Sequence, residues 1–247
     1  MRIAAAAILS YVALCALLYL LQDRLIYHRV REVDRPGAQS LRIQSNDALV
    51  KVWVLHPGRR AAVIYFGGNA DDVGASLADF SATFPERTVY LVNYRGYGGS
   101  TGRPSEVALI ADAQLIYDHI APRHERIIAM GRSLGTAVAT ALAASRPVER
   151  LILATPFDTL GNVAAEHFPI FPVHWLLRDQ YNSAARIGSV RAPVLVLVAQ
   201  HDRVISRARS DALIAAIPAP LRQVVVINGA SHDDLQLFLA YLQQRPA

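Results

Sequence analysis

Residues 126–139 read RIIAMGRSLGTAVA, and this stretch decides the fold. A short apolar run ends in Gly-x-Ser-x-Gly, and small residues that suit a helix follow at once. This strand–turn–helix context is the one in which the pentapeptide carries a nucleophilic serine. Ser133 would lie at the tip of a strained turn, between Gly131 and Gly135, because side chains at the two glycines would collide with neighbouring backbone. Without catalysis, the stretch is an ordinary strand-to-helix turn that packs closely.

A serine nucleophile needs a base that accepts its proton and a carboxylate that orients the base. In sheets of this kind the chain order is serine, then acid, then histidine. Asp202 and His232 lie in the loops after the last two predicted strands, at the same sheet edge as Ser133. We therefore predict that these three residues form a catalytic triad, with His201 and Asp233 as substitutes. Otherwise the acid and the base are a turn carboxylate and a solvated loop histidine.

Two backbone N–H groups must also face the oxygen that becomes negative during the reaction. Leu134, the residue after the serine, is expected to supply one of them. The loop Gly67-Gly68-Asn69 follows an earlier predicted strand, and its glycines let the backbone approach a substrate closely. We expect the second donor to be the N–H of Asn69 or of Gly68, and prefer Asn69. A tight strand-to-helix turn would use the same three residues.

Apolar runs alternate with helical patterns along the rest of the chain. Two alternating runs, 41–43 and 50–55, predict an antiparallel pair at a sheet edge. Continuous apolar runs, typical of strands buried on both faces, occur at 62–66, 88–93, 126–130, 151–154, 194–199 and 223–227. Helices are predicted at 72–83, 105–120, 133–145, 207–216 and 234–243. The pattern predicts an α/β fold whose mostly parallel sheet is covered by helices on both faces.

Residues 3–21 carry no charged side chain and predict a transmembrane helix. The helix would be about 28 Å long, close to the roughly 30 Å hydrocarbon core of a bilayer. The segment exceeds the apolar core of a cleavable signal peptide, and no small-x-small cleavage site follows it. We therefore predict a transmembrane anchor at residues 1–22 and a catalytic domain at residues 23–247. The expected location is the cell membrane, with a single pass; a cleaved signal is the alternative.

The side of the membrane stays open at this stage. Arg24, Arg29, Arg31 and Arg35 follow the apolar segment and only Arg2 precedes it, so the positive-inside rule favours a cytoplasmic domain. A two-residue tail before an apolar segment resembles an export signal instead, which would place the domain outside.

Composition narrows the function classes. The length of 247 residues suits one sizeable α/β domain, and the 53% hydrophobic content suggests an additional apolar segment. The net charge of +5 is spread over scattered arginines without a basic run, so we predict no nucleic-acid binding. Cys15 is the only cysteine and excludes an internal disulfide. No CxxC, HExxH or histidine cluster is present, and we predict neither a metal nor a cofactor.

An insertion at about residues 155–192 separates two predicted core strands. It contains Phe157, Phe168, Phe171 and Trp175. We expect this cap to cover the site and to line an apolar acyl pocket; alternatively, its aromatic side chains fill the core of the cap itself.

Other polar and glycine-rich features have structural interpretations. The segment 93–100 is glycine-rich but lacks the pattern of a phosphate-binding loop. We predict a structural loop whose Arg95 and tyrosines pack near the site. Asp112 and Asp158 are expected to be polar groups of a helix or loop rather than catalytic residues.

Together these residues resemble the α/β-hydrolase superfamily, and more narrowly its membrane-anchored Bem46/ABHD13/ABHD17-like branch, often grouped with serine aminopeptidase S33-type hydrolases. The resemblance covers residues 20–239, nearly the whole chain. It rests on QDRLIY at 22–27, YFGGNA at 65–70, NYRGYGGS at 93–100, GRPSE at 102–106, GRSLG at 131–135 and PVLV at 193–196. It implies a serine hydrolase fold with Ser133, Asp202 and His232 as the triad. Gly67 departs from the His-Gly-Asn usual in such loops, which keeps the backbone donors but removes a side chain that supports the loop.

The leading hypothesis is a membrane-anchored serine hydrolase of the esterase, lipase or thioesterase type. It would cleave carboxylic esters or thioesters of small or lipid-like acyl substrates through an acyl-enzyme on Ser133. One alternative is a serine peptidase of the aminopeptidase type, which needs acidic groups around the cap to hold a substrate amine. The cap offers only Asp158, Glu166 and Asp179. The other alternative is a catalytically inactive membrane scaffold on the same fold.

Overall fold

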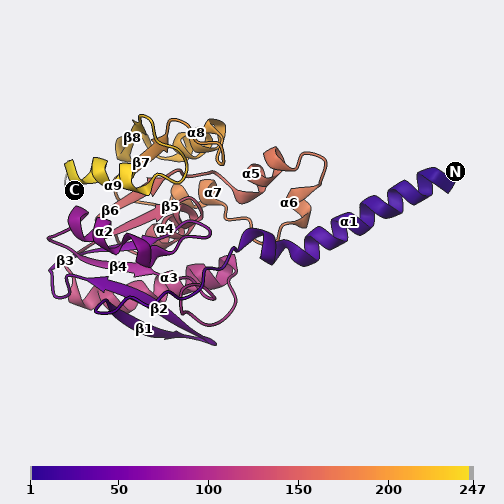
Figure 1. The fold of residues 1–247 in the computed structure, drawn as a ribbon. Helices are drawn as coiled ribbons and strands as arrows, with labels where there is room; N and C mark the ends of the chain where they lie inside the picture. The colour runs from indigo at the N-terminus through magenta and orange to yellow at the C-terminus, as the bar shows by residue number, and fades with distance from the viewer. Residues whose placement is uncertain (1, 245–247) are drawn as a thin grey trace.

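The computed structural model describes residues 2–244, and within them eight strands form one sheet in the order β1-β2-β4-β3-β5-β6-β7-β8 (Figure 1). The pairs β1–β2 and β2–β4 are antiparallel, and the other neighbours are parallel. The strands are β1 Gln39–Ser45, β2 Ala48–Leu55, β3 Ala61–Phe66, β4 Thr88–Val92, β5 Arg126–Arg132, β6 Arg150–Ala154, β7 Val194–Ala199 and β8 Arg222–Ile227. The predicted edge pair and the predicted mostly parallel sheet are confirmed.

Helices cover both faces of this sheet (Figure 1). On one face, side chains of α3, α4, α7 and α8 share a core with the strands, and on the other face those of α2 and α9 do so. The helices are α1 Arg2–Ile26, α2 Leu77–Thr83, α3 Glu106–Ile120, α4 Leu134–Ser145, α5 Leu160–His167, α6 Val173–Leu176, α7 Ser183–Ile187, α8 Arg207–Ala216 and α9 Leu235–Gln244; the 3-10 helices are η1 Val73–Ser76, η2 Ala121–Arg123 and η3 Ala219–Leu221.

The alternation of side chains along a strand explains the two cores. In β3, Ile64 and Phe66 belong to the core under α3 and α4, whereas Val63 and Tyr65 belong to the core under α2 and α9. Successive side chains of a strand point to opposite faces of the sheet, so a strand between two helical layers must be apolar throughout. The continuous apolar runs of the sequence follow from this requirement.

One predicted helix is divided in two. The expected helix at 72–83 begins as the 3-10 helix η1 and continues as α2. Gly74 lies in η1, where a Cβ atom would be 2.5 Å from Arg35 Nε and 2.8 Å from Trp53 Nε1. Arg35 also forms an ion pair with Asp72, just before η1. The 3-10 turn η1 therefore packs closely against the side chain of Arg35.

The insertion at 155–192 folds as a small helical cap that contains α5, α6 and α7. Thr159 caps α5 by accepting a hydrogen bond from the Asn162 N–H, and Asn182 caps α7 in the same way from Ala185. In Figure 1, α5 and α6 lie on the side of the domain from which α1 departs. The cap and the apolar N-terminal helix are therefore neighbours.

Helix α1 extends away from the sheet and is long enough and apolar enough to cross a bilayer (Figure 1). It runs without a break through residue 22 to Ile26. Most of its side chains are exposed, but Gln22 is buried against the cap. The last turns of this helix thus belong to the packed domain.

The turn between β5 and α4 depends on a very close approach of backbone segments. Only Ser133 separates the last residue of β5 from the first residue of α4. A Cβ atom at Gly135 would lie 2.0 Å from the carbonyl oxygen of Phe66 in β3, and one at Gly131 would lie 2.2 Å from the Gly135 carbonyl oxygen. Glycine is required at both positions because the neighbours are backbone atoms that have no freedom to move aside.

Replacing Gly135 tests this close approach. The Gly135→Ala variant should lose about 3 kcal/mol or more of unfolding free energy, because its methyl group overlaps the backbone of β3. Gly188→Ala is the matched control, since a Cβ atom there has nothing within 4 Å, and its change should stay within about 0.5 kcal/mol. Denaturant unfolding of the detergent-solubilised protein measures both values. Equal stability of the two variants would contradict the packing described.

Candidate active site

Ser133 lies at the tip of the turn between β5 and α4, with a strained backbone. Its φ of +50° and ψ of −119° fall in a region that residues with a side chain rarely adopt. The Ser133 N–H donates to the Ala154 carbonyl oxygen at 2.9 Å, and the Ser133 carbonyl oxygen accepts from the N–H and the hydroxyl of Thr136 at 2.9 and 2.6 Å. These bonds fix both sides of the residue.

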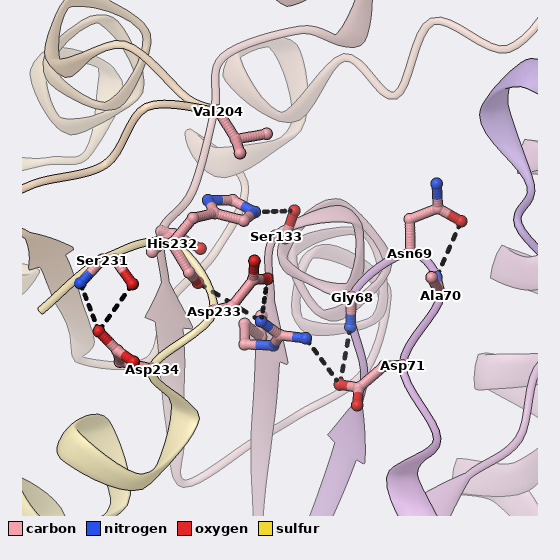
Figure 2. A network of polar contacts seen from close by, with 12 residues as sticks. Gly68, Asn69, Ala70, Asp71, Ser133, Val204, Ser231, His232, Asp233 and Asp234 are labelled. Atoms are coloured by element: carbon pink, nitrogen blue, oxygen red, sulfur yellow. Dashed lines mark hydrogen bonds and ion pairs between the residues drawn. The ribbon is translucent and has the colours of Figure 1, made fainter.

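His232 lies between Ser133 and Asp202 in a continuous hydrogen-bonded series. Its Nε2 is 2.9 Å from the Ser133 hydroxyl oxygen (Figure 2), and its Nδ1 is 2.8 Å from Asp202 Oδ2. Asp202 lies in the loop after β7 and His232 in the loop after β8, the positions that the chain order indicated. The structure thus brings the three predicted side chains together.

The two substitute residues lie elsewhere. Asp233 pairs with Arg132 at 3.1 Å, and its side chain is largely exposed. The side chain of His201 is exposed as well, although its backbone N–H donates to the Ala230 carbonyl oxygen. Neither side chain takes part in the series that ends at Ser133.

The carboxylate of Asp202 is held in its charged form. Burial by itself raises the pKa of this group, but hydrogen bonds and charge interaction with His232, with further bonds from Ile205 and Val204, outweigh burial and lower the pKa below its usual value. Asp202 Oδ1 accepts from the N–H groups of Val204 and Ile205 at 2.9 and 2.8 Å. The acid is thus both charged and oriented toward the imidazole.

The candidate oxyanion donors differ in whether their N–H groups are engaged. Leu134 is the first residue of α4, so its N–H has no acceptor within the helix. The Gly68 N–H donates to Asp71 Oδ2 at 3.2 Å (Figure 2). Within residues 2–244, the backbone N–H of Asn69 donates no hydrogen bond. This difference favours Asn69 over Gly68 as the second donor.

An ion pair occupies the space beside Gly67. A Cβ atom at this glycine would lie 2.8 Å from Asp71 Oδ2, and Asp71 is 3.2 Å from Arg132 Nη2. Nη1 of the same arginine lies 3.1 Å from Asp233 and 3.4 Å from the His232 carbonyl oxygen. Arg132 therefore connects the loop Gly67-Gly68-Asn69, through Asp71, to the loop of His232.

The sequence reasoning missed Arg132 and Asp71. Two local signals pointed to them: a charged residue inside Gly-x-Ser-x-Gly, and an aspartate two residues after Asn69. Their pairing depends on the parallel neighbours β3 and β5, because these strands bring the two loops side by side. The contact between Arg132 and Asp71 therefore becomes visible only when the pairing of β3 with β5 is known.

The tyrosines of the glycine-rich loop contact the oxyanion loop, as predicted. Tyr94 donates its hydroxyl to the Gly67 carbonyl oxygen at 2.8 Å, and Tyr97 donates to Asn69 Oδ1 at 3.0 Å. The same Oδ1 accepts from the His28 N–H at 2.9 Å. The side chain of Asn69 is therefore held by two donors, Tyr97 and His28. His28 follows the end of α1 by two residues.

The remaining predicted polar groups have structural partners. Arg95 pairs with Asp112 at 2.7 Å in a buried position and also contacts Asp47. Asp158 forms an ion pair with Arg209 at 2.9 Å. Arg95 serves the packing of its own loop and does not belong to the polar network around Ser133.

A cavity of about 530 Å³ opens at Ser133. Its wall contains apolar residues of the cap, including Phe157, Phe168 and Phe171, and none of its lining residues is acidic. Three of the four aromatic residues named for the cap therefore line the cavity, whereas Trp175 has neither of the two expected roles. Trp175 does not line the cavity and is 90% exposed.

No metal site accompanies these residues within the described part of the chain. Among residues 2–244, no group of three or more histidine, cysteine, aspartate or glutamate side chains is placed to hold a metal ion.

Comparison with known proteins identifies relatives in sequence. The model of the alpha/beta hydrolase family matches residues 53–186. An uncharacterized protein of Mycobacterium tuberculosis is 42% identical over 186 residues, which are 73% of this chain and 66% of that protein. Alpha/beta hydrolase domain-containing protein 17C of Xenopus tropicalis is 30% identical over 222 residues, 87% of this chain and 70% of the relative.

Solved structures share the fold at low identity. An esterase of Pyrococcus furiosus superposes with a TM-score of 0.71 at 17% identity, covering 89% of this chain and 95% of the esterase. Est1E of Butyrivibrio proteoclasticus, solved with ferulic acid bound, gives a TM-score of 0.69 at 14% identity, covering 83% and 96% of the two chains.

The lowered pKa of Asp202 predicts a pH dependence of stability. A carboxyl group whose pKa is lowered by folding stabilises the fold above its unfolded pKa of about 4, and this contribution is lost as the pH falls through the lower folded value. Below about pH 4, the unfolding free energy of the wild type should therefore fall more steeply than that of Asp202→Asn. Urea unfolding at a series of pH values measures the slopes. Parallel slopes would count against the assigned interaction.

Removing one partner of the Arg132–Asp71 pair tests its role. Arg132→Leu leaves the mostly buried Asp71 carboxylate without its counter-ion, at an expected cost of about 3–5 kcal/mol of unfolding free energy. The double variant Arg132→Leu/Asp71→Asn should lose less than the single variant, because the unpaired charge is gone. Chemical denaturation compares them. A double variant as unstable as the sum of both single variants would show that the pair is not coupled.

Proposed function

This chain belongs to the alpha/beta hydrolase family, and on that premise we propose that it is a membrane-anchored serine hydrolase that cleaves carboxylic esters or thioesters. One observation carries the proposal: the hydrogen-bonded series Ser133–His232–Asp202 lies at the wall of an apolar cavity. A serine beside an imidazole can be deprotonated as it attacks, and a neighbouring carboxylate stabilises the resulting imidazolium.

The proposed reaction proceeds in two stages. His232 Nε2 takes the proton of Ser133 as its hydroxyl oxygen bonds to the acyl carbon, and the N–H groups of Leu134 and Asn69 hold the oxyanion. His232 then gives the proton to the leaving alcohol or thiol, which leaves an acyl-enzyme on Ser133. In the second stage His232 takes a proton from water as the water oxygen bonds to the acyl carbon. The bond between this carbon and the Ser133 oxygen then breaks, His232 returns the proton to the Ser133 oxygen, and the acid leaves.

The character of the cavity supports an acyl group as the part of the substrate that is bound. Apolar side chains from the cap surround it, and a hydrocarbon chain gains free energy by leaving water for such a surface. An aminopeptidase would need a carboxylate to pair with the substrate ammonium group. Asp158 and Glu166 are instead paired with Arg209, and Asp179 accepts a hydrogen bond from Tyr27. This arrangement favours esters and thioesters over peptides.

Retention of α1 as an anchor is part of the proposal. Gln22 in this helix donates to the Leu176 carbonyl oxygen at 3.1 Å and accepts from the Arg178 N–H at 2.8 Å. Tyr27, one residue after the helix, donates to Asp179 at 2.6 Å. A signal segment that is cleaved would leave these cap groups without partners, so the contacts support an uncleaved transmembrane helix at the cell membrane.

Replacing the nucleophile tests the proposed chemistry. Ser133→Ala should lower hydrolysis of a p-nitrophenyl ester by about 10⁴-fold or more, because no acyl-enzyme can form. Ser145→Ala is the matched control, since Ser145 lies on the same helix α4 at its other end, and it should keep wild-type turnover. Parallel assays with aminoacyl arylamides distinguish peptidase from esterase activity. Ester turnover that survives in Ser133→Ala, or faster cleavage of the arylamide, would overturn the proposal.

A further inference from the structure

We propose that the tip of the cap, residues 168–177, enters the bilayer beside α1, and that the active-site cavity receives the acyl chain directly from the lipid. The inference rests on the proposed function and names a second membrane-contacting element and a route for the substrate. Figure 1 shows the segment between α5 and α6 reaching outward along α1. We call residues 168–177 the cap tip.

Helix α1 forms one wall of the active-site cavity. Leu18, Gln22, Leu25 and Ile26 line it together with Ser133. The four helix residues are spaced by four, three and one, so they lie on one face of α1. The helix is thus part of the substrate site as well as an anchor, and the cavity lies against a segment of membrane-spanning composition.

The cap tip contacts α1 deep within its apolar segment. The Tyr11 hydroxyl donates to the Ile170 carbonyl oxygen at 2.7 Å, and the Tyr11 and Phe171 rings stack with centroids 6.0 Å apart. At 1.5 Å per residue, the Cα of Tyr11 lies about 15 Å along the helix from Leu21, the last residue of the uncharged segment. That distance is about half of a hydrocarbon core of roughly 30 Å. A helix that spans the bilayer therefore carries the cap tip into the lipid.

The composition of the cap tip suits a hydrocarbon environment. It reads FPIFPVHWLL and contains no charged residue. Phe168, Ile170 and Trp175 are 54%, 70% and 90% exposed, and none of them belongs to either hydrophobic core. Large apolar side chains gathered on a surface mark a contact with another apolar phase. The adjoining membrane-spanning helix identifies that phase as lipid.

Most backbone N–H groups of the cap tip are paired; among the described residues, only those of Ile170 and His174 donate no hydrogen bond. Its N–H groups at Phe168, Phe171 and Val173 donate to carbonyl oxygens within the cap, and Pro169 and Pro172 have no N–H to satisfy. A non-helical segment enters hydrocarbon at a high cost unless such groups are paired. The two prolines therefore lower the cost of burying this turn.

The first charged residues that follow the apolar segments of α1 and of the cap tip lie next to each other. Arg178, directly after the cap tip, pairs with Asp23 at 2.6 Å, and Asp23 is the first charged residue after the uncharged segment of α1. Arg24 follows it. Basic side chains at the end of an apolar segment are typical of the headgroup region. The cap tip and α1 thus share one boundary between lipid and water.

Fluorescence of the two tryptophans tests insertion without any turnover. Full-length protein is reconstituted in phosphatidylcholine–phosphatidylglycerol vesicles with or without bromine on the acyl chains. Trp175 should be quenched by the brominated lipid, whereas Trp53 is buried in the domain and should not be. The quenched fraction of the emission should therefore vanish in Trp175→Phe. Emission that brominated lipid leaves unchanged, but aqueous acrylamide quenches, overturns the proposal even if the esterase is active.

Kinetics test the route of the substrate. Ile170→Asp/Trp175→Asp should lower hydrolysis of a long-chain ester embedded in vesicles by about ten-fold or more, because charges oppose insertion. Its turnover of a soluble short-chain ester should stay at the wild-type level. Leu237→Asp, an exposed leucine on α9, is the matched control and should affect neither rate. Equal loss on both substrates, or no loss on the embedded ester, overturns direct entry; wild-type protein inactive on both refutes the proposed function instead.

Discussion

The contact between the first turn of α4 and the end of β3 is the constraint on which the site depends. No side chain fits between Gly135 and the Phe66 carbonyl oxygen, and this approach forces the chain to reverse direction within the single residue Ser133. The cost of its positive φ is offset by the packing of β5 and α4 against their neighbours. The serine hydroxyl consequently stands at the sheet edge where two later loops deliver His232 and Asp202.

A polar network holds the loops around that serine. Arg132 joins the oxyanion loop, through Asp71, to the loop of His232. The sequence resemblance led us to expect a histidine at position 67; Gly67 leaves the space beside it to the Asp71 carboxylate. A buried arginine with carboxylate partners restricts both loops at once, because moving either one separates charges. The departure at Gly67 therefore replaces one means of support with another.

Helix α1 and the loop of Asn69 are connected through few hydrogen bonds. Asn69 accepts a hydrogen bond from the backbone of His28, which follows α1 by two residues, and Gln22 holds the cap from the same helix. Helix α1, the cap and the loop of Asn69 therefore form one packed unit. If α1 is the membrane anchor that we propose, the position of the domain on a bilayer also orients the mouth of the cavity.

Much of this structure was predictable because its determinants are local. The apolar runs fixed the strands, and Gly-x-Ser-x-Gly between a strand and a helix located the turn at Ser133. The chain order then pointed to Asp202 and His232. Contacts between distant segments were not predictable: Arg132 with Asp71, and Tyr11 with Ile170, depend on which loops the folded sheet brings together. The split of the helix at 72–83 depends in the same way on Arg35 packing against Gly74.

The contrast between local patterns and contacts of distant segments also explains why the sequence predicted the existence of the cap but not the role of each of its aromatic residues. Its aromatic residues were visible in the sequence, but hydrophobicity alone does not separate a cavity wall from an exposed surface. Phe157 lines the cavity, whereas Trp175 is exposed and does not line it. The cavity itself forms only when distant segments of the chain meet, because residues of α1 line it together with those of the cap.

The most direct test of the central claim is the site of covalent modification by a fluorophosphonate. Full-length protein in detergent is labelled, digested and mapped by mass spectrometry. We expect one adduct, on the peptide that contains Ser133, and no adduct when His232 is replaced by alanine, because the serine then lacks its base. An adduct on another residue, or an unlabelled Ser133 in folded wild-type protein, would contradict it.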